Sequence, residues 1–458
     1  MAGIGFALRK LTRQDNLMGS VQAYLYSALI TTGPWLFTII ALTSILYVAG
    51  KFVTIDVIND FRRILIYNFA FSLITTGPLY MVVTRFMADS LYRRDVSGTP
   101  GLMLGALIVL YLFELPLSCA FYLGYANLEF GTALTGILNY MLISTVWMVI
   151  VFISALHNYV LVTAAFGVGM FSGIVASFFL AQRFGSAGIL NSFSFGLAVI
   201  VAILISRIFA EYPYPFMKPF EFLKYFKPYY QLALNGLFYN LAAWIDKILM
   251  WFAPEADRPG SLLNLYPNYD TAMFLAYISI IPAMAMFTVT VETSFFEKYI
   301  HFFHGITDYS TLAQIRDNHK NLLNNVLRSS RNFLVLQLSI CVLGILTAPR
   351  IFSAFNINFM QIGIFRFGIM GAFFQIMIMF LSVLVQYFDQ RAIALRIQVT
   401  FFLTNTVFTL ITLKLGFKYY GAGYFYATLF TFIITSIHVM AYTEKLIFHT
   451  FVTNNIKD

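Results

Sequence analysis

Long apolar stretches recur along the whole of this 458-residue chain, with only short connections between them. A helix that crosses the hydrocarbon core of a bilayer needs about 20 mostly apolar residues, and about twelve stretches meet that requirement. Charged residues make up only 11% of the chain, whereas soluble proteins carry roughly 25%. We therefore predict an all-α integral membrane protein without a soluble domain. The predicted spans lie near 24–49, 64–88, 101–125, 133–156, 159–182, 188–210, 230–252, 271–294, 331–348, 363–387, 393–413 and 420–443.

The basic residues indicate how the chain is oriented. When the N-terminal arm with Arg9, Lys10 and Arg13 is placed in the cytoplasm, most of the 29 Lys and Arg residues fall on that side. Loops rich in Lys and Arg remain cytoplasmic in membrane proteins, so both termini are predicted to be cytoplasmic. The net charge of +9 then reflects topology and attraction to anionic lipid, and we do not expect nucleic-acid binding.

A basic, proline-bearing stretch at 211–229 interrupts the apolar pattern between the sixth and seventh predicted spans. It divides the chain into a six-helix lobe over 1–210 and a second six-helix lobe over 230–458, the latter with a cytoplasmic loop at 295–330. Two halves of six helices, with the pathway between them, are a recurrent architecture of transporters. Each half begins with basic residues that lead into a span with aromatic residues at its start. The alternative explanation is that these two starts are similar by chance.

The sequence Ile-Thr-Thr-Gly-Pro occurs twice, in the first and second predicted spans. Proline inside a helix removes one backbone hydrogen bond, and glycine permits bending. Threonine hydroxyls can satisfy the carbonyl that the proline frees, which here is that of Ile74 in the second copy. The copies are either tolerated kinks or hinges that move during transport. The candidate hinge residues are Gly33, Pro34, Gly77, Pro78 and, in the third span, Pro116.

Four charged residues fall inside predicted spans: Glu114, Asp246, Lys247 and Arg366. A charge at the bilayer centre is costly unless it is paired or faces water. We therefore interpret the four as candidates for a substrate pathway or ion coupling, with structural interhelix ion pairs as the alternative. Asp246 and Lys247 are adjacent and point about 100° apart on a helix, so we expect that they do not neutralise each other and that each faces a different partner or a cavity. Lys247 could instead extend its ammonium group to the membrane surface.

The chain shows no sequence signal of an enzyme. It lacks a G-x-x-x-x-G-K-[ST] phosphate loop, and neither G-x-S-x-G nor H-E-x-x-H occurs. Glu297, His301 and His304 have metal-ligand spacing on a helix, but a solvated polar face explains them better, so we predict neither a metal nor a cofactor. Tyrosines inside the spans offer apolar faces with hydroxyl groups, which suit a neutral sugar as well as ordinary helix packing.

An amphipathic pattern covers 310–333, within the predicted loop. Apolar residues recur on one helical face and polar residues occupy the other. Such a helix either lies on the cytoplasmic membrane surface or docks a cytoplasmic partner. The candidate docking residues are Leu312, Ile315, Arg316, Leu322 and Val326.

Two stretches of this sequence resemble a known family. The start "MAGIGFALRKL", followed by "YLYSALITTGPW" and by "LITTGP" in the next span, resembles the PelG family of inner-membrane exporters of the Pel exopolysaccharide. That family is similar to the flippase branch of the multidrug/oligosaccharidyl-lipid/polysaccharide (MOP) superfamily. "NGLFYNLAAWIDKILMW" is similar to the seventh span of such flippases, where an Ile-Asp dipeptide often stands.

The resemblance implies a two-lobed, MATE- and flippase-like fold of twelve helices in the bacterial inner membrane. It also implies export of an aminosugar-rich polymer to the periplasm for a biofilm matrix, by alternating access or channel-like passage. The implied partners are a cytoplasmic glycosyltransferase and other inner-membrane Pel subunits, including a cyclic-di-GMP receptor. The interior has few charges, which favours direct polymer passage over a lipid-linked substrate. The alternatives are a drug/ion antiporter or lipid-linked oligosaccharide flippase of the same fold, and a membrane scaffold for a polysaccharide synthase.

Overall fold

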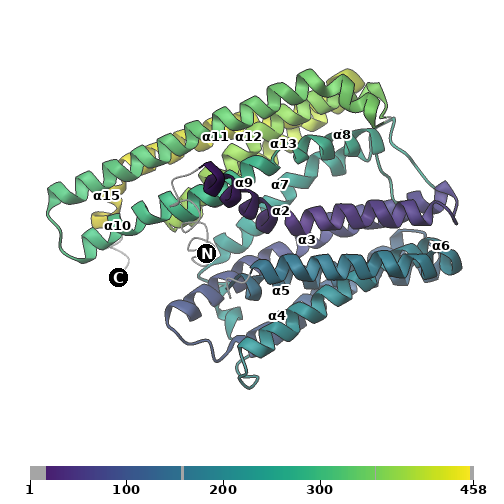
Figure 1. Cartoon of the computed structure of the whole chain (residues 1–458), viewed down its shortest axis with the longest axis horizontal. Coiled ribbons are helices and arrows are strands. Elements are labelled where there is room, and N and C mark those ends of the chain that lie inside the picture. Colours follow the sequence, from purple (N-terminus) through teal and green to yellow (C-terminus); the bar gives the residue numbers. More distant parts are fainter. Residues whose placement is uncertain (1–16, 156–158, 356, 454–458) are drawn as a thin grey trace. The chain divides into compact units, whose positions relative to one another are not determined.

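The computed structural model describes residues 17–155, 159–355 and 357–453, and these residues are almost entirely helical (Figure 1). Within them the only β pairing is a single bridge between Asp257 and Leu265. The predicted all-α fold is therefore confirmed. The N-terminal arm with its basic residues, including the start of the family-like segment, lies outside the described residues.

The chain forms two compact units. The N-unit comprises Thr32–Trp244 and Met250–Tyr266, and the C-unit comprises 17–31, Ile245–Leu249 and 267–453 of the described chain. The units thus divide within α7 (Tyr230–Met250) and not at 211–229. The first part of α7 belongs to the N-unit because it packs closely on α3. The six-plus-six division of the spans remains a prediction.

In the N-unit, α5 is the central helix and packs against α3, α4 and α6. Within α6, glycines let the two parts of the helix approach closely, since a Cβ atom at Gly169 would lie 2.6 Å from the carbonyl oxygen of Gly196. The helices of this unit begin with α2 (Leu17–Ala49, in part), α3 (Ile55–Tyr92), α4 (Thr99–Cys119) and the π-helix η1 (Ala120–Tyr125), and continue with α5 (Phe130–Ala155), α6 (Tyr159–Glu211), the 3-10 helix η2 (Glu221–Tyr225) and the first part of α7.

In the C-unit, α12 is the central helix and packs against α8, α11 and α14. After the short α7 segment the unit contains α8 (Pro267–Ile278), α9 (Ile281–Thr290), the π-helix η3 (Val291–Phe295), α10 (Phe296–Thr307), α11 (Leu312–Ala354), the 3-10 helix η4 (Phe359–Gln361), α12 (Ile362–Tyr387), α13 (Arg391–Leu415), the 3-10 helix η5 (Phe417–Tyr419), α14 (Ala422–Glu444), α15 (Leu446–Phe448) and the π-helix η6 (His449–Thr453).

All twelve predicted spans coincide with helices. Ten helical stretches of the described chain are long and apolar enough to cross a membrane. One of them, Val160–Glu211, contains two predicted spans, because Gly185 with φ of 55° breaks α6 between them. A left-handed φ is costly for residues other than glycine. The predicted seventh span coincides with α7, which is not among the ten, so the number of crossings remains a prediction.

The segment predicted as a cytoplasmic loop at 295–330 with an amphipathic helix at 310–333 is mostly helical, and the helix is longer than predicted. The helix α10 continues from η3, and after a short turn α11 runs without interruption from Leu312 through the ninth predicted span to Ala354. A capping box starts α11: the Thr311 side chain accepts from the Gln314 backbone N–H, and the Gln314 side chain accepts from the Thr311 backbone N–H. The amphipathic stretch is therefore not a separate helix on the membrane surface.

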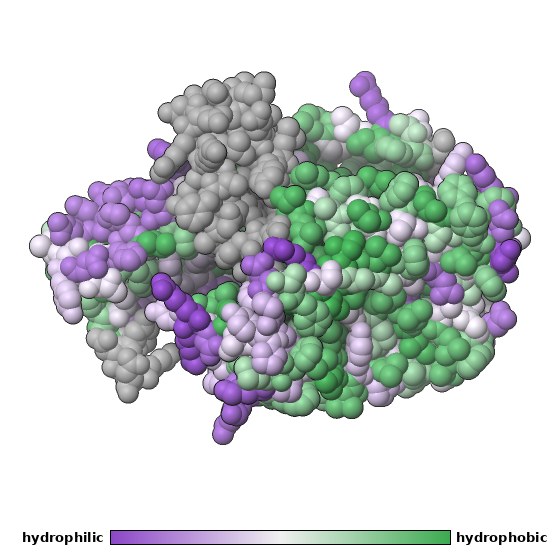
Figure 2. Space-filling view, turned by 60° about the horizontal axis from the view of Figure 1, so that its bottom comes forward, coloured by the Kyte–Doolittle hydropathy of each residue, from purple (hydrophilic) through white to green (hydrophobic). Residues whose placement is uncertain are grey.

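Apolar side chains form much of the outer surface of each unit. Figure 2 shows one face on which hydrophobic residues cover most of the coloured area. On α4 and α6, for example, Phe113 is 71% exposed and Phe179 is 70% exposed. A soluble protein rarely exposes apolar patches of this extent, whereas lipid tails provide matching surroundings. With the apolar helices, this surface supports a multi-pass membrane protein.

Candidate functional site

Asp246 and Lys247 form an ion pair in the interior of the C-unit. The Nζ atom of Lys247 lies 3.2 Å from each carboxylate oxygen of Asp246. Asp246 is fully buried and Lys247 is 9% exposed. The prediction that these adjacent residues have separate partners is therefore wrong, because the flexible four-carbon stem of lysine lets the ammonium group fold back. Lys247 also does not extend away from the protein interior.

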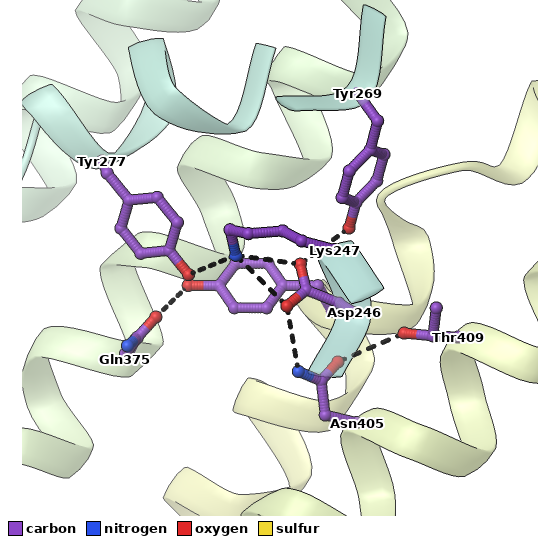
Figure 3. A network of polar contacts seen from close by, with 8 residues as sticks. Asp246, Lys247, Tyr269, Tyr277, Gln375, Asn405 and Thr409 are labelled. Carbon is purple, nitrogen blue, oxygen red and sulfur yellow. Dashed lines mark hydrogen bonds and ion pairs between the residues drawn. The ribbon is translucent and has the colours of Figure 1, made fainter. Parts of the chain in front are cut away.

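Helices distant in the sequence supply further polar groups to the carboxylate (Figure 3). The Tyr269 hydroxyl of α8 donates to Asp246 Oδ2 at 2.9 Å. The Asn405 amide of α13 approaches Oδ1 at 3.5 Å, and its own carbonyl oxygen accepts from the Thr409 hydroxyl at 3.2 Å. Since Tyr269, Asn405 and Thr409 are all at most 1% exposed, the carboxylate is held in one position.

Aromatic rings surround the ammonium group. Lys247 Nζ donates to the Tyr277 hydroxyl at 3.3 Å and lies 4.8 Å from the centre of that ring and 5.8 Å from the centre of the Tyr424 ring. Such a position over ring faces is favourable for a cation. The Tyr424 hydroxyl in turn donates to Gln375 Oε1 of α12. Tyr277 and Gln375 are partly exposed, so these two side chains are the members of the cluster that a solute could contact.

The cluster around Asp246 is electrically neutral, since one carboxylate meets one ammonium group. A buried pair of this kind is stable only when further hydrogen bonds satisfy it, as they do here. A proton or metal cation would have to compete with Lys247 for Asp246. The hydroxyl and amide groups around the pair are of the type that hydrogen-bonds neutral sugars.

Glu114 of α4 occupies a different environment in the N-unit. It is 2% exposed, and its Oε1 atom lies 2.6 Å from the Thr75 hydroxyl and 3.0 Å from the Thr76 hydroxyl. The Tyr140 hydroxyl of α5 lies 2.8 Å from that of Thr75. The Oε2 atom makes no hydrogen bond of ordinary geometry within the described residues, although Ser144 lies beside the carboxyl group.

No Lys, Arg or His of the described chain forms an ion pair with Glu114. An ionised carboxylate that is buried without a cation costs several kcal/mol. This carboxyl group is therefore stable when it is neutral or when it binds a cation. Between Glu114 and Asp246, Glu114 is the one whose carboxylate has an oxygen without a hydrogen bond in the described structure.

The second Ile-Thr-Thr-Gly-Pro motif lies directly against Glu114. Its two threonines were expected to help satisfy the carbonyl of Ile74 that Pro78 frees, but neither hydroxyl bonds that group. Thr75 contacts the Phe71 carbonyl at 2.8 Å instead, and both hydroxyls contact Glu114. The threonine motif and Glu114 were both singled out in the sequence, but that they lie close together depends on how α3 packs on α4.

Gly77, the glycine of that motif, lies where α3 and α7 touch. A Cβ atom at Gly77 would lie 2.7 Å from the Gly236 carbonyl oxygen of α7, and a Cβ atom at Gly236 would lie 2.4 Å from the Gly77 carbonyl oxygen. The Asn240 amide donates to the Leu73 carbonyl at 2.7 Å across the same contact. Close approach of the two helices thus requires glycine at both positions.

The first copy differs from the second. Gly33 is buried, and α2 continues through Pro34. The Thr38 hydroxyl donates to the Pro34 carbonyl at 2.8 Å. The side chain of Thr31 lies outside the described residues. The hinge roles of both copies remain predictions.

Two other candidates do not join either cluster. Arg366 lies exposed in the second turn of α12 and is not part of the Asp246 cluster. Pro116 is exposed in the last part of α4, two residues after Glu114, and the π-helix η1 begins at Ala120. The sequence position of Arg366 inside an apolar run did not reveal that its side chain points outward.

The candidate docking residues separate into two groups. Leu312 is 54% exposed and Arg316 is also exposed. Ile315 and Leu322 are at most 5% exposed, and Val326 packs with them against the hydrophobic core of the C-unit. Ile315, Leu322 and Val326 are therefore covered by this chain itself and are not free to bind a partner, whereas docking through Leu312 and Arg316 remains a prediction.

Sequence reasoning missed several members of the Asp246 cluster. The signal that could have found them is a polar side chain within an apolar run, which in a membrane protein usually faces other helices. Tyr277 and Tyr140 are among the tyrosines inside predicted spans that suit either a neutral sugar or ordinary helix packing, and the sequence did not connect them with Asp246 or Glu114. The missed residues are Tyr269, Gln375, Asn405, Thr409 and Tyr424.

Solved structures with the same fold are transporters. A MOP superfamily transporter from Pyrococcus furiosus matches with a TM-score of 0.62 and 12% identity over 92% of this chain and 96% of its own. An inward-facing multidrug resistance MATE transporter matches with a TM-score of 0.59 and 14% identity over 93% and 99%, respectively. An outward-facing one matches with a TM-score of 0.63 and 15% identity over 92% and 96%. At these identities the likeness concerns the fold.

The family comparison covers nearly the whole chain. No protein of curated function matches this sequence. The family model for PelG, an exopolysaccharide exporter (EPS-E), matches residues 1–451. The chain therefore belongs to the PelG family of exopolysaccharide exporters and has the fold of the MOP superfamily.

Proposed function

We propose that this protein moves an aminosugar-rich exopolysaccharide of the Pel type across the bacterial inner membrane, from cytoplasm to periplasm, for the biofilm matrix. The observation that carries the proposal is the family match over residues 1–451. The fold supports it, since solved transporters of this fold are recorded as inward-facing and outward-facing. Both termini are proposed to be cytoplasmic.

The interior chemistry is consistent with a sugar polymer. The Asp246–Lys247 pair is internally neutral, and the groups around it are tyrosine hydroxyls and amides. Such groups bind neutral sugars by stacking and hydrogen bonds. Transport then requires binding and conformational change and no covalent step, so we propose that the protein is not an enzyme.

The direct test is export of labelled polymer by purified protein in vesicles. We expect polymer to cross when this protein is present, and the comparison of vesicles with and without a proton or sodium gradient identifies the energy source. In cells, deletion of the gene should abolish surface polysaccharide while polymer synthesis in the cytoplasm remains possible. Unchanged secretion after deletion would contradict the proposal.

One observation favours a second function, a drug/ion antiporter on the same fold. Glu114 has a buried oxygen without a hydrogen bond in the described structure, which suits a coupling proton or cation. Asp246 suits this role less well, because Lys247 occupies it. Raised drug sensitivity after deletion, restored by wild type but not by Glu114→Gln, would support the antiporter over the exporter.

We further propose that a cytoplasmic glycosyltransferase and other inner-membrane Pel subunits, including a cyclic-di-GMP receptor, bind this protein. The exposed Leu312 and Arg316 at the start of α11 remain candidates for that contact. Co-purification of the glycosyltransferase should weaken when both are replaced by Ser. Full co-purification with the double variant would exclude this contact. Normal export despite lost co-purification would show that transport does not depend on it.

A further inference from the structure

The segment between α6 and α7, residues 212–229, is fixed on the N-unit and is here named the strap. Phe222 in η2 is fully buried. The strap backbone lies directly on α4: a Cβ atom at Gly101 would lie 2.0 Å from the Met217 carbonyl oxygen, and one at Gly105 would lie 1.7 Å from that of Pro219. The four-residue spacing of these glycines creates a smooth strip on which another backbone can rest.

Aromatic contacts fix the end of the strap to α3. The ring of Tyr225 packs edge-on against Phe86 at 4.9 Å between centres and is stacked with Tyr229 at 5.2 Å. The guanidinium carbon of Arg85 lies 5.1 Å from the centre of the Tyr229 ring, and Arg85 also pairs with Asp89 at 3.2 Å. The strap is therefore held at several points along its length and does not behave as a free linker.

The outward side of the strap combines apolar and cationic side chains. Between Tyr214 and Tyr230, six large apolar residues are exposed by 42% to 60%, and the lysines among them are exposed as well. Lys218 has a 75% exposed side chain and is 3.9 Å from Glu221, the one acidic residue within the strap. Glu211, the residue directly before the strap, forms an ion pair with Arg207. The exposed apolar residues are Tyr214, Phe216, Met217, Phe220, Leu223 and Tyr230, and the lysines are Lys218, Lys224 and Lys227.

The position of the strap determines what surrounds this side. It joins the last residue of α6 to the first residue of α7, both predicted to span the bilayer, so it lies where the chain leaves the hydrocarbon. Aromatic rings gather at this level of a membrane. Lysines there are attracted by anionic headgroups. At Met217 and Pro219 there is no room for the exposed rings between the strap and α4, because the strap backbone there lies directly on α4.

We propose that the outward side of the strap is a lipid-binding surface, in which the aromatic side chains enter the headgroup region and the three lysines bind anionic phospholipid headgroups. The strap thereby fixes the N-unit to the cytoplasmic leaflet, given the proposed orientation. This surface does not depend on which solute the protein transports.

The test places a fluorophore on the strap. Cys119 and Cys341 are the two cysteines of the chain, so a background with both replaced by Ser accepts a single new cysteine at Phe220→Cys, labelled with the polarity-sensitive dye NBD. The matched control is Tyr309→Cys, in the turn before α11, where the native side chain is 96% exposed. Both proteins are reconstituted in vesicles of phosphatidylcholine alone or mixed with phosphatidylglycerol.

At position 220 we expect quenching by brominated lipid, and iodide quenching several-fold weaker than at position 309. Phosphatidylglycerol should strengthen the lipid quenching at 220, and Lys218→Gln/Lys224→Gln/Lys227→Gln should remove that increase. The basic control Arg316→Gln/Lys320→Gln on α11 should leave it intact. Leu223→Cys serves as a second reporter if Phe220→Cys destabilises the protein.

Two results would overturn the proposal. The first is iodide quenching on the strap as strong as at position 309, which would place the strap in water. The second is a phosphatidylglycerol response that persists in the triple-lysine variant, which would assign it to another part of the protein. A response to dissolved inorganic phosphate equal to that of phosphatidylglycerol would contradict binding of a lipid surface.

Discussion

Asp246 in the C-unit and Glu114 in the N-unit, the two acidic residues found buried among those whose side chains the structure describes, have opposite electrostatic surroundings. Asp246 meets the ammonium group of Lys247 at 3.2 Å and accepts from Tyr269. Glu114 meets only hydroxyl groups and keeps one oxygen without a hydrogen bond in the described structure. The same chemical group is therefore internally neutralised in one unit and dependent on a proton or an added cation in the other.

Burial alone therefore does not define a site that couples transport to a proton or a cation. A carboxylate with a permanent cation contributes a fixed dipole, and its partner must be displaced before anything else binds. A carboxyl group among hydroxyls can change its charge when a proton or a cation arrives. If the two environments differ as their geometry indicates, substitutions at Asp246–Lys247 and at Glu114 should lower the free energy of unfolding by different amounts.

The largest effect is expected for Lys247→Met. It leaves Asp246 buried without a cation, and breaking such a pair on one side costs about 3–5 kcal/mol. Thermal unfolding in detergent measures the loss. The double variant Asp246→Asn/Lys247→Met should recover much of it, and Lys414→Met on the exposed side of α13 is the control. A loss below about 1 kcal/mol would show that Lys247 is not the group that neutralises the Asp246 carboxylate.

The next effect is expected for Thr76→Val, which removes one donor to Glu114 while keeping the side-chain shape. Loss of a hydrogen bond to a charged group costs about 1.5–3 kcal/mol, and to a neutral group about 0.5–1.5 kcal/mol. Measured in wild type and in Glu114→Gln, the difference therefore reports whether Glu114 is ionised. Thr84→Val on the same helix, with an exposed hydroxyl, should change stability by less than about 0.5 kcal/mol.

A similar or smaller effect is expected for Gly77→Ala. Its new methyl group would meet the backbone of α7 at Gly236, and overpacking of this kind costs about 1–3 kcal/mol. The displacement would also move the adjacent threonines relative to Glu114. Gly33→Ala, the same substitution in the first copy of the motif, is the comparison; it lies at a buried position of α2. Equal losses at the two glycines would mean that the two copies have the same role.

The smallest effect on stability is expected for Glu114→Gln. A glutamine oxygen can accept from the same two threonines, so the free energy of unfolding should fall by less than about 1 kcal/mol. Transport should respond much more strongly if Glu114 carries the coupling charge. The measurement pairs thermal unfolding with gradient-driven transport in vesicles, and full transport by this variant would exclude the coupling role.

The helices were largely predictable because each span has to satisfy its backbone hydrogen bonds within itself. This requirement makes apolar length a reliable signal, and the break at Gly185 lies between two predicted spans. The prediction was incomplete at 295–330, where the amphipathic helix was expected as a separate element, whereas α11 continues it into the ninth predicted span. The length and hydropathy of an apolar stretch predict which residues span the membrane. They do not show how far a helix such as α11 extends beyond that stretch.

The candidate site was predictable only in part. Glu114, Asp246 and Lys247 were identified because charges are rare in apolar runs, and all three are buried. Their partners were not identified, since Tyr269, Asn405 and Tyr424 resemble many other polar residues in the sequence. Arg366 has the same sequence signal as Glu114 but is exposed, because helical rotation decides whether a charge faces a neighbour or the outside.

Local composition and motif identity were enough to predict a helical membrane protein related to exopolysaccharide exporters. Which charges are paired could be read only from the packing of the helices. This packing brings Asp246 to groups from α8 and α13, and it places Thr75 and Thr76 of the repeated motif on Glu114. Side chains that are far apart in the chain meet through helix packing, and packing depends on the rotation and close approach of whole helices, as at Gly77 and Gly236.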